Sequence, residues 1–232
     1  MKIIGIIPAR YGSTRFPGKP IAVIAGKPMI QWVYEAARKS KILGRVIIAT
    51  DDKRILDCAA KFTKDVMLTP EFNSGTDRLA YAAKDIDCDI VVNIQGDEPL
   101  IKPEVITAAV APLAEIPAIY VGTIATEFET DSERDDPNNV KVIVDKNNFA
   151  IYFSRLPLPA ALKHIGLYVY RKDFLMKFSG LKQTELELKE KLEQLRIIEN
   201  GYKIYVTKTG YKTVGVDTKG DLEKVEKIIS QR

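Results

Sequence analysis

The chain has 232 residues, of which 46% are hydrophobic and 28% are charged, a composition that lets a globular protein fold without a metal or a disulfide. Its 35 Lys and Arg against 31 Asp and Glu give a net charge of +4, too mild and dispersed for a nucleic-acid-binding protein. The two cysteines, Cys58 and Cys88, lie in no metal-ligand spacing and indicate thiols of a reducing compartment. No apolar run approaches the ~20 residues of a membrane span, and no signal-peptide pattern follows Met1. We therefore expect a cytoplasmic protein without membrane insertion.

Strands and helices alternate along the first half of the chain. The apolar run 2–7 predicts a strand buried on both faces, and the apolar spacing over 29–39 predicts a helix. Further strands are predicted at 45–49, 66–68 and 89–94, and further helices at 51–62, 76–84 and 103–113. This alternation is typical of βαβ units and predicts an α/β fold with a mostly parallel central sheet flanked by helices.

The rhythm changes in the second half, where helices become rare. Strands are predicted at 119–126, 140–144, 150–154 and 165–170, with an acidic surface loop over 127–139. A helix at 184–199, strands at 204–206 and 213–216 and a helix at 218–229 complete the chain. We expect one domain over 1–232, with a smaller, partly antiparallel lobe inserted at about 119–200.

The loop after the first strand is the most informative segment. It carries the cations Arg10, Arg15 and Lys19 among glycines and prolines, which shape a backbone rather than leave it floppy. Cations and backbone N–H groups in a concave loop suit a polyphosphate. A plain basic surface loop is the alternative, but the carboxyl end of a strand is where open α/β sheets bind ligands.

Two well-known phosphate-binding loops do not fit this segment. Gly12 and Gly18 enclose five residues rather than the four of a Walker A loop, and Pro20 replaces the hydroxyl that would hold Mg²⁺. The third glycine of the dinucleotide pattern is also missing. Any metal must therefore be held elsewhere in the chain.

Two aspartates are candidates for holding a metal. Asp97 follows the strand 89–94, at the sheet edge where the loop also emerges, and Mg²⁺ usually takes one or two carboxylates together with water and phosphate. Asp217 lies between a predicted strand and helix. An ordinary turn for Asp97 and a helix N-cap for Asp217 remain alternatives. The two residues are 120 positions apart, so only the fold could bring them together.

The loop resembles a family signature, in the run Ile7-Pro8-Ala9-Arg10-Tyr11-Gly12-Ser13-Thr14-Arg15-Phe16-Pro17-Gly18-Lys19-Pro20. It is similar to the 3-deoxy-manno-octulosonate (KDO) cytidylyltransferases, or CMP-KDO synthetases, and further runs extend the resemblance over nearly the whole chain. The resemblance implies a Rossmann-like fold of the nucleotide-diphospho-sugar transferase type. It also implies Mg²⁺-dependent coupling of CTP and KDO to CMP-KDO with release of pyrophosphate, for lipopolysaccharide synthesis, by a homodimer.

The same resemblance assigns roles to individual residues. Arg10, Lys19, Asp97 and Asp217 would be catalytic, and the two aspartates would be the metal ligands. The substrate-contacting positions would be Ala9, Ser13, Asn73, Ser74, Gly75, Arg78, Gln95, Arg155, His164, Tyr168, Glu193 and Gln194.

Several of these residues also have a purely structural interpretation. Ser74 or Thr76 could cap the helix that follows, whereas Arg78 in its first turn opposes the helix dipole unless a buried anion offsets it. His164 is the single histidine of the chain and shares a strand face with Tyr168 by alternation. The helical pattern alone places Glu193 and Gln194 on a solvated surface.

The connection 156–163 between the Phe-Ser-Arg and His-x-Gly-x-Tyr runs is shorter than in the family, which puts in doubt a lid or interface element built from it. Two rival functions are a CMP-sialic acid synthetase and a non-catalytic nucleotide-binding module. The His-x-Gly-x-Tyr run disfavours the first, and aspartates at strand ends disfavour the second.

Overall fold

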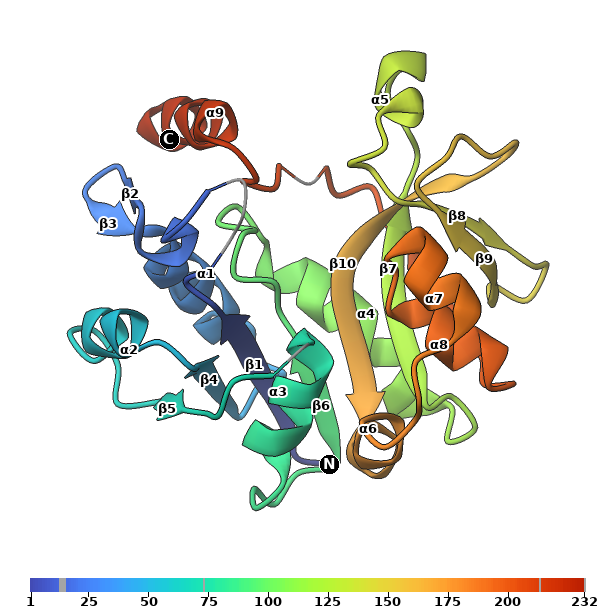
Figure 1. Ribbon diagram of the computed structural model, residues 1–232, viewed down its shortest axis with the longest axis horizontal. Coiled ribbons are helices and arrows are strands. Elements are labelled where there is room, and N and C mark those ends of the chain that lie inside the picture. Colours follow the sequence, from blue (N-terminus) through green and yellow to red (C-terminus); the bar gives the residue numbers. More distant parts are fainter. Residues whose placement is uncertain (13–15, 73, 213, 232) are drawn as a thin grey trace. The chain divides into compact units, whose positions relative to one another are not determined.

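The computed structural model describes residues 1–12, 16–72, 74–212 and 214–231. The chain divides into two compact units, one of residues 1–107 with 213–232 and the other of residues 108–212 (Figure 1). The second unit is therefore an insertion in the chain of the first. Of the helices that the structure describes, none is both long and apolar enough to cross a lipid bilayer.

The first unit is built on parallel strands in the order β6-β1-β4-β5. Their bounds are β1 (Ile3–Ala9), β4 (Arg45–Thr50), β5 (Val66–Leu68) and β6 (Ile90–Asn93). Strand β1 pairs with both β4 and β6, and its Ile6 and Ile7 are fully buried, as expected for a strand covered on both faces. The carboxyl ends of β1 and β6 consequently lie side by side at one edge of the sheet.

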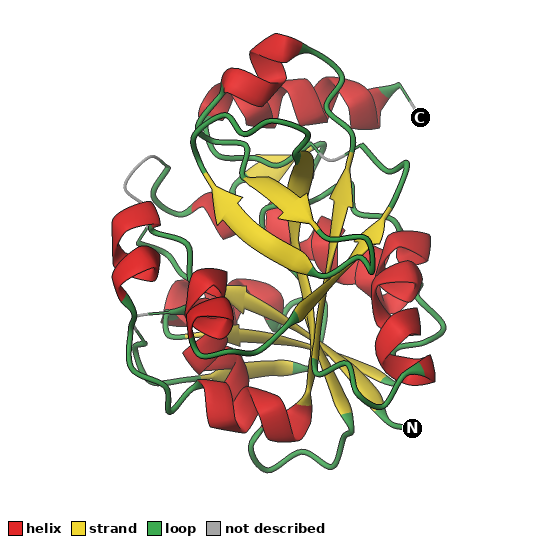
Figure 2. Cartoon of the chain, turned by 90° about the vertical axis from the view of Figure 1, so that its right-hand side faces the viewer, coloured by secondary structure: helices red, strands yellow, loops and turns green. Residues whose placement is uncertain are grey.

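Helices flank these strands (Figure 2). In the first unit they are α1 (Met29–Arg38), α2 (Lys53–Ala59), α3 (Gly75–Ala83), α9 (Lys219–Ser230) and the short 3₁₀ helix η1 (Lys19–Ile21). A separate apolar cluster joins α9 to the rest of the unit through Ile24, Met29, Leu100, Val216 and Val225. The final helix is therefore packed onto the same unit as the loop after β1.

A small hairpin also contacts α9. Its strands, β2 (Val23–Ile24) and β3 (Lys27–Pro28), are joined by Ala25 and Gly26, whose φ angles of 45° and 80° are those of a type I′ turn. The Ala25 N–H donates to Glu226 Oε1 of α9 at 2.9 Å. The hairpin thus ties the residues that follow the loop to the end of the chain.

The second unit contains mainly antiparallel strand pairs. Strand β7 (Val121–Thr126) runs parallel to β11 (Ile204–Lys208) and antiparallel to β10 (Leu162–Arg171). Strand β10 also pairs with β8 (Lys141–Val144), which pairs with β9 (Ala150–Ser154), and both of these pairs are antiparallel. Its helices are α5 (Asp131–Asp135), α6 (Lys172–Phe178), α7 (Glu185–Glu190) and α8 (Gln194–Glu199), and α4 (Pro103–Glu115) contains the boundary between the units. The predicted fold class is confirmed.

Three predicted elements are wrong. The expected helix 184–199 is two helices, because Lys191 adopts a left-handed φ of 56° and ends α7. The acidic loop 127–139 contains α5, which is capped by Thr130 Oγ1 accepting from the Glu133 N–H at 3.1 Å. Of the strand predicted at 213–216, residue 213 lies outside the described residues and residues 214–216 form no strand; the Val216 N–H donates instead to the Asp97 carbonyl oxygen, in a turn of the first unit.

Candidate active site

The loop after β1 is closed at its base. The Gly18 N–H donates to the Tyr11 carbonyl oxygen at 2.9 Å. Gly18 has a φ of 71°, and a Cβ there would lie 3.1 Å from the Tyr11 ring, so only glycine fits. The Arg54 guanidinium lies 3.3 Å from the centroid of the same ring, a cation–π contact that holds it in place. Gly18 therefore shapes the base of the loop as predicted, whereas Gly12 has no left-handed φ. Ser13 and Arg15 lie outside the described residues.

Lys19 lies between the two candidate metal ligands. Its Nζ is 2.7 Å from Asp97 Oδ2 and 3.1 Å from Asp217 Oδ1, and its side chain is only 12% exposed. Burial disfavours the charged ammonium, but the two carboxylates outweigh that effect and raise the pKa of Lys19. Arg10, which follows β1, is exposed. The fold thus brings together a loop cation and two acidic groups that the sequence places far apart.

Two backbone features place Asp217 beside Asp97. The Val216 N–H donates to the Asp97 carbonyl oxygen at 2.9 Å, which brings the chain back to the end of β6. Thr218 is the N-cap of α9, because its Oγ1 accepts from the Asp221 N–H at 3.2 Å and Asp221 Oδ2 accepts from the Thr218 N–H at 2.9 Å. The N-cap alternative for Asp217 is therefore wrong, and its carboxylate contacts Lys19 instead.

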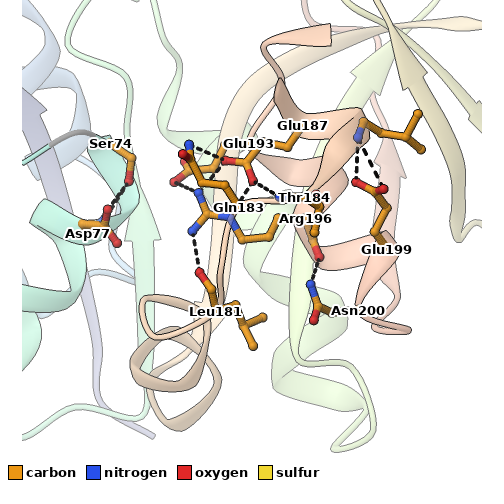
Figure 3. A network of polar contacts seen from close by, with 11 residues as sticks. Ser74, Asp77, Leu181, Gln183, Thr184, Glu187, Glu193, Arg196, Glu199 and Asn200 are labelled. Atoms are coloured by element: carbon orange, nitrogen blue, oxygen red, sulfur yellow. Dashed lines mark hydrogen bonds and ion pairs between the residues drawn. The ribbon is translucent and has the colours of Figure 1, made fainter. Parts of the chain in front are cut away.

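Residues 74–78 form the start of α3. Ser74 is the N-cap, since its Oγ accepts from the Asp77 N–H at 3.1 Å; the Ser74–Asp77 side-chain contact is drawn in Figure 3. Gly75 is the first residue of the helix. Thr76 is the second residue of the helix and is buried, so the cap position belongs to Ser74. Asn73 lies outside the described residues.

Arg78 cross-links three strand ends within the first unit. Only 3% exposed, it contacts Asp51 Oδ2 through Nη2, and its Nη1 donates to Thr69 Oγ1 at 3.3 Å and to the Ala9 carbonyl oxygen at 3.5 Å. Asp51, whose side chain is partly buried, is the anion that offsets an arginine in the first helical turn. Arg78 therefore supports the backbone at the base of the loop, and its contact with a substrate stays a prediction.

His164 and Tyr168 lie together on β10 in the second unit. Their ring centroids are 5.3 Å apart, and the Phe153 ring meets His164 edge-on at 5.2 Å. The predicted shared face is confirmed. Burial lowers the pKa of His164 to about 3, so the ring is neutral at pH 7, and His164 Nε2 lies 2.9 Å from Thr123 Oγ1. The Tyr168 hydroxyl is buried and has no hydrogen-bond partner among the described residues.

Arg155 follows β9, and its backbone carbonyl group is held by a hydrogen bond from a lysine side chain. Its carbonyl oxygen accepts from Lys141 Nζ at 2.9 Å, and the same Nζ donates to the Asp136 carbonyl oxygen at 2.7 Å. Arg155 Nη1 donates to the Pro137 carbonyl oxygen at 3.2 Å. Lys141 is fully buried, and this burial lowers its pKa. Sequence reasoning missed Lys141, although a single lysine inside an apolar strand is a signal for it.

Glu193 and Gln194 lie at the break between α7 and α8. Gln194 is only 8% exposed, so their assignment to a solvated helix surface is wrong, because the helix that would have exposed them is interrupted. Glu193 Oε1 is 3.9 Å from Arg196 Nη2. Arg196 also forms a buried pair with Glu187, through Nε to Oε2 at 2.7 Å and a second contact from Nη2 to Oε1 (Figure 3). Burial opposes ionisation of Glu187, but Arg196 outweighs it and lowers the pKa of Glu187.

The candidate residues fall into one set in each unit. In the first unit are Arg10, Lys19, the two aspartates, the start of α3 and Gln95, whose Nε2 donates to Asn93 Oδ1 at 3.4 Å. In the second unit are Arg155, His164, Tyr168, Glu193 and Gln194. The first set contains cations and carboxylates, the groups that a phosphate- and metal-binding site requires. The second set contains mostly side chains that can form hydrogen bonds with a polar ligand.

Comparison with known proteins places this arrangement in a family. A family model described as "Cytidylyltransferase" matches residues 4–204. Proteins named 3-deoxy-manno-octulosonate cytidylyltransferase from Syntrophotalea carbinolica and Geotalea uraniireducens are 50% and 49% identical to the chain, and each alignment covers 97% of this chain and 98% of the relative. A solved structure of CMP:2-keto-3-deoxy-manno-octonic acid synthetase complexed with CTP superposes with a TM-score of 0.94 at 39% identity, covering 100% of this chain and 99% of that one. The chain therefore belongs to the 3-deoxy-manno-octulosonate cytidylyltransferase family.

Proposed function

We propose that this chain couples CTP and KDO to CMP-KDO and releases pyrophosphate. The anomeric hydroxyl oxygen of KDO forms a bond to the α-phosphorus of CTP, the bond from that phosphorus to the pyrophosphate oxygen breaks, and the hydroxyl proton passes to solvent. The observation that carries the proposal is the contact of Lys19 with Asp97 and Asp217, in a chain half identical to enzymes of that name. A loop cation and two carboxylates at one sheet edge are what triphosphate chemistry requires.

Lys19 and Arg10 are the groups we assign to the triphosphate. Lys19 is held charged by its carboxylate neighbours, and Arg10, at the start of the same loop, is exposed. Both cations offset phosphate charge, and the backbone of the closed loop adds N–H donors. Because the Gly18 N–H donates to the Tyr11 carbonyl oxygen, the backbone at the base of the loop is already fixed before CTP binds, whereas the Lys19 ammonium must leave the two carboxylates to reach the phosphates.

The residues present fit a divalent cation. Asp97 and Asp217 already converge on one cationic atom, Lys19 Nζ, and two carboxylates with phosphate and water suit Mg²⁺. Within the described ranges no group of three or more His, Cys, Asp or Glu could hold a metal ion, so substrate oxygens and water would have to complete the coordination. When bound there, Mg²⁺ would lower the pKa of the sugar hydroxyl and spread the phosphoryl charge. Asp97 and Asp217 would hold it.

Substrate contacts complete the assignment. The cytidine would meet the segment with Asn73, Ser74 and Gly75, and Ala9, Ser13 and Arg78 would be further substrate contacts. The sugar would meet Gln95, Arg155, His164, Tyr168, Glu193 and Gln194. The unit of residues 108–212 would then serve as the sugar-binding and dimerisation lobe of a single nucleotidyltransferase domain. The same proposal includes a homodimer in the cytoplasm that activates KDO for lipopolysaccharide synthesis.

Pyrophosphate release tests the proposal. Purified protein with CTP and Mg²⁺ should release pyrophosphate when KDO is added, but neither without sugar nor with sialic acid in its place. Asp97→Asn should abolish the signal, whereas the matched change Asp131→Asn, at an exposed residue of α5, should not. CTP binding without any pyrophosphate would support a binding module instead, and faster turnover with sialic acid would support the rival synthetase.

A further inference from the structure

A hydroxyl in β7 contacts three groups of β10 at a break in the strand pairing. The register between β7 and β10 shifts between Ile165 and Tyr168, as at a β-bulge. Thr123, fully buried, places its Oγ1 2.8 Å from the Leu167 carbonyl oxygen, 3.4 Å from the Ile165 carbonyl oxygen and 2.9 Å from His164 Nε2. One side chain therefore joins the bulge to the histidine.

Counting protons in this cluster determines which nitrogen of His164 is protonated. A threonine hydroxyl has one proton to donate and lone pairs to accept with, whereas a carbonyl oxygen only accepts. Without a proton between them, two oxygens at 2.8 Å would repel each other, so the Thr123 proton is directed at Leu167. The third contact is then satisfied only if His164 Nε2 carries a proton and donates it to Thr123.

The other ring nitrogen is then a bare acceptor. His164 is neutral, since burial lowers its pKa to about 3, and a neutral imidazole has one donor and one acceptor. With the proton on Nε2, the lone pair is on Nδ1, to which none of the described residues donates a hydrogen bond. The neighbouring rings offer no charge, and the Tyr168 hydroxyl, also without a partner among the described residues, is a second open group in the same cluster.

We propose that Thr123 is a positioning residue that fixes His164 in the Nε2–H tautomer, so that Nδ1 accepts a hydrogen bond from a hydroxyl of the sugar substrate. The identity of the ligand in this inference rests on the proposed function, whereas the tautomer of His164 follows from the hydrogen bonds of Thr123 alone. It assigns His164 to a donor group of the sugar rather than to the sugar's carboxylate, because a bare nitrogen lone pair and a carboxylate are both acceptors.

Nuclear magnetic resonance can read the tautomer directly. His164 is the single histidine of the chain, so selective ¹⁵N-histidine labelling yields one imidazole spectrum without assignment. The free parent protein should show a proton on Nε2 and none on Nδ1, unchanged between pH 8 and about pH 5, since the pKa lies well below that range. A protonated Nδ1, or an imidazolium at pH 7, would overturn the proposal.

Three variants separate positioning from general damage. Thr123→Val keeps the shape but removes the hydroxyl, and should give a mixture of tautomers; Thr123→Ser should restore the parent spectrum. The matched control is Thr207→Val in β11, because that buried hydroxyl has no partner among the described residues and its loss should leave the His164 spectrum unchanged. An unchanged spectrum in Thr123→Val would overturn the positioning role.

Kinetics then test the ligand. Thr123→Val should raise the KM for KDO by about tenfold, the loss expected for one hydrogen bond, with the KM for CTP within about twofold of the parent, and Thr123→Ser should restore both. A changed tautomer with an unchanged KM for KDO would overturn the hydroxyl contact. A parent protein without CMP-KDO synthesis would instead refute the proposed function, and the spectrum of the free protein would still decide the tautomer.

Discussion

Replacing Lys19 by methionine should strengthen metal binding in the absence of nucleotide while weakening the binding of CTP. In the free protein the Lys19 ammonium contacts the two carboxylates that we assign to the metal. A divalent cation must therefore displace it, unless bound phosphates draw it away. Methionine keeps most of the side-chain volume and removes only the competing charge.

The geometry gives the size of the effect. Hydrogen bonds between charged groups are worth about 1.5–3 kcal/mol each, and Lys19 makes two, at 2.7 and 3.1 Å. The carboxylates are 33% and 42% exposed, so solvent screening reduces the gain, and we take about 1.5–3 kcal/mol for both together. That free energy corresponds to a roughly ten- to hundredfold increase in the affinity for the metal.

The assay is a Mn²⁺ titration followed by electron paramagnetic resonance, without CTP. The matched control is Lys27→Met, because Lys27 Nζ pairs at 2.7 Å with Glu35 on the same unit and its loss changes the net charge equally. Lys19→Met should bind Mn²⁺ more tightly than both the parent and Lys27→Met, and calorimetry should show weaker CTP binding. Equal Mn²⁺ affinity in Lys19→Met and Lys27→Met would refute the competition between ammonium and metal.

Three further predictions concern the remaining charged groups. Asp97→Asn or Asp217→Asn should lower kcat by roughly a thousandfold or more with CTP affinity largely kept, and the double variant should be little worse than either single one; turnover within about tenfold of the parent would contradict the metal assignment. Arg196→Met should cost about 3–5 kcal/mol in urea unfolding, because Glu187 is left buried and uncompensated, whereas Glu187→Gln with Arg196→Met should recover much of it. The pKa of Glu187 is lowered in the folded protein. The ionised carboxylate therefore stabilises the fold above the ordinary carboxyl pKa, and this stabilisation is lost as the pH falls through the lowered pKa of the folded state. The free energy of unfolding of the parent should consequently fall more in acid than that of the double variant. Arg10→Ala should weaken CTP binding with a change of only about 0.5 kcal/mol in the free energy of unfolding, and unchanged affinity by calorimetry would remove Arg10 from the site.

Local pattern was sufficient to predict the elements that carry the proposed phosphate-binding residues. Apolar runs located β1 and β6, and the rule that parallel strands present their carboxyl ends at one edge placed the loop and Asp97 near each other. The capping residues of α3 were also readable, because Ser74 stands where a side-chain acceptor is needed. These inferences depend on residues close in sequence or on the general geometry of parallel sheets.

Other features depend on contacts that no local pattern records. Asp217 reaches the site through contacts between segments far apart in the sequence, among them the hydrogen bond from the Val216 N–H to the Asp97 carbonyl oxygen. The break after α7 occurs at a lysine in the left-handed region, where glycine would have been the signal, so the burial of Gln194 was not predictable. Thr123 looks like any strand threonine, and its importance follows only from the bulge opposite it.

The Val216–Asp97 hydrogen bond also has a consequence for biosynthesis. It joins positions 97 and 216, and the whole inserted unit of residues 108–212 is made by the ribosome between them. Closing a flexible loop of that length costs about 4 kcal/mol, less if the inserted unit folds first. A nascent or prematurely terminated chain can therefore form the phosphate loop with Lys19 and Asp97 but lacks the second carboxylate. Under the proposed metal assignment, turnover would begin only once the segment with Asp217 has docked.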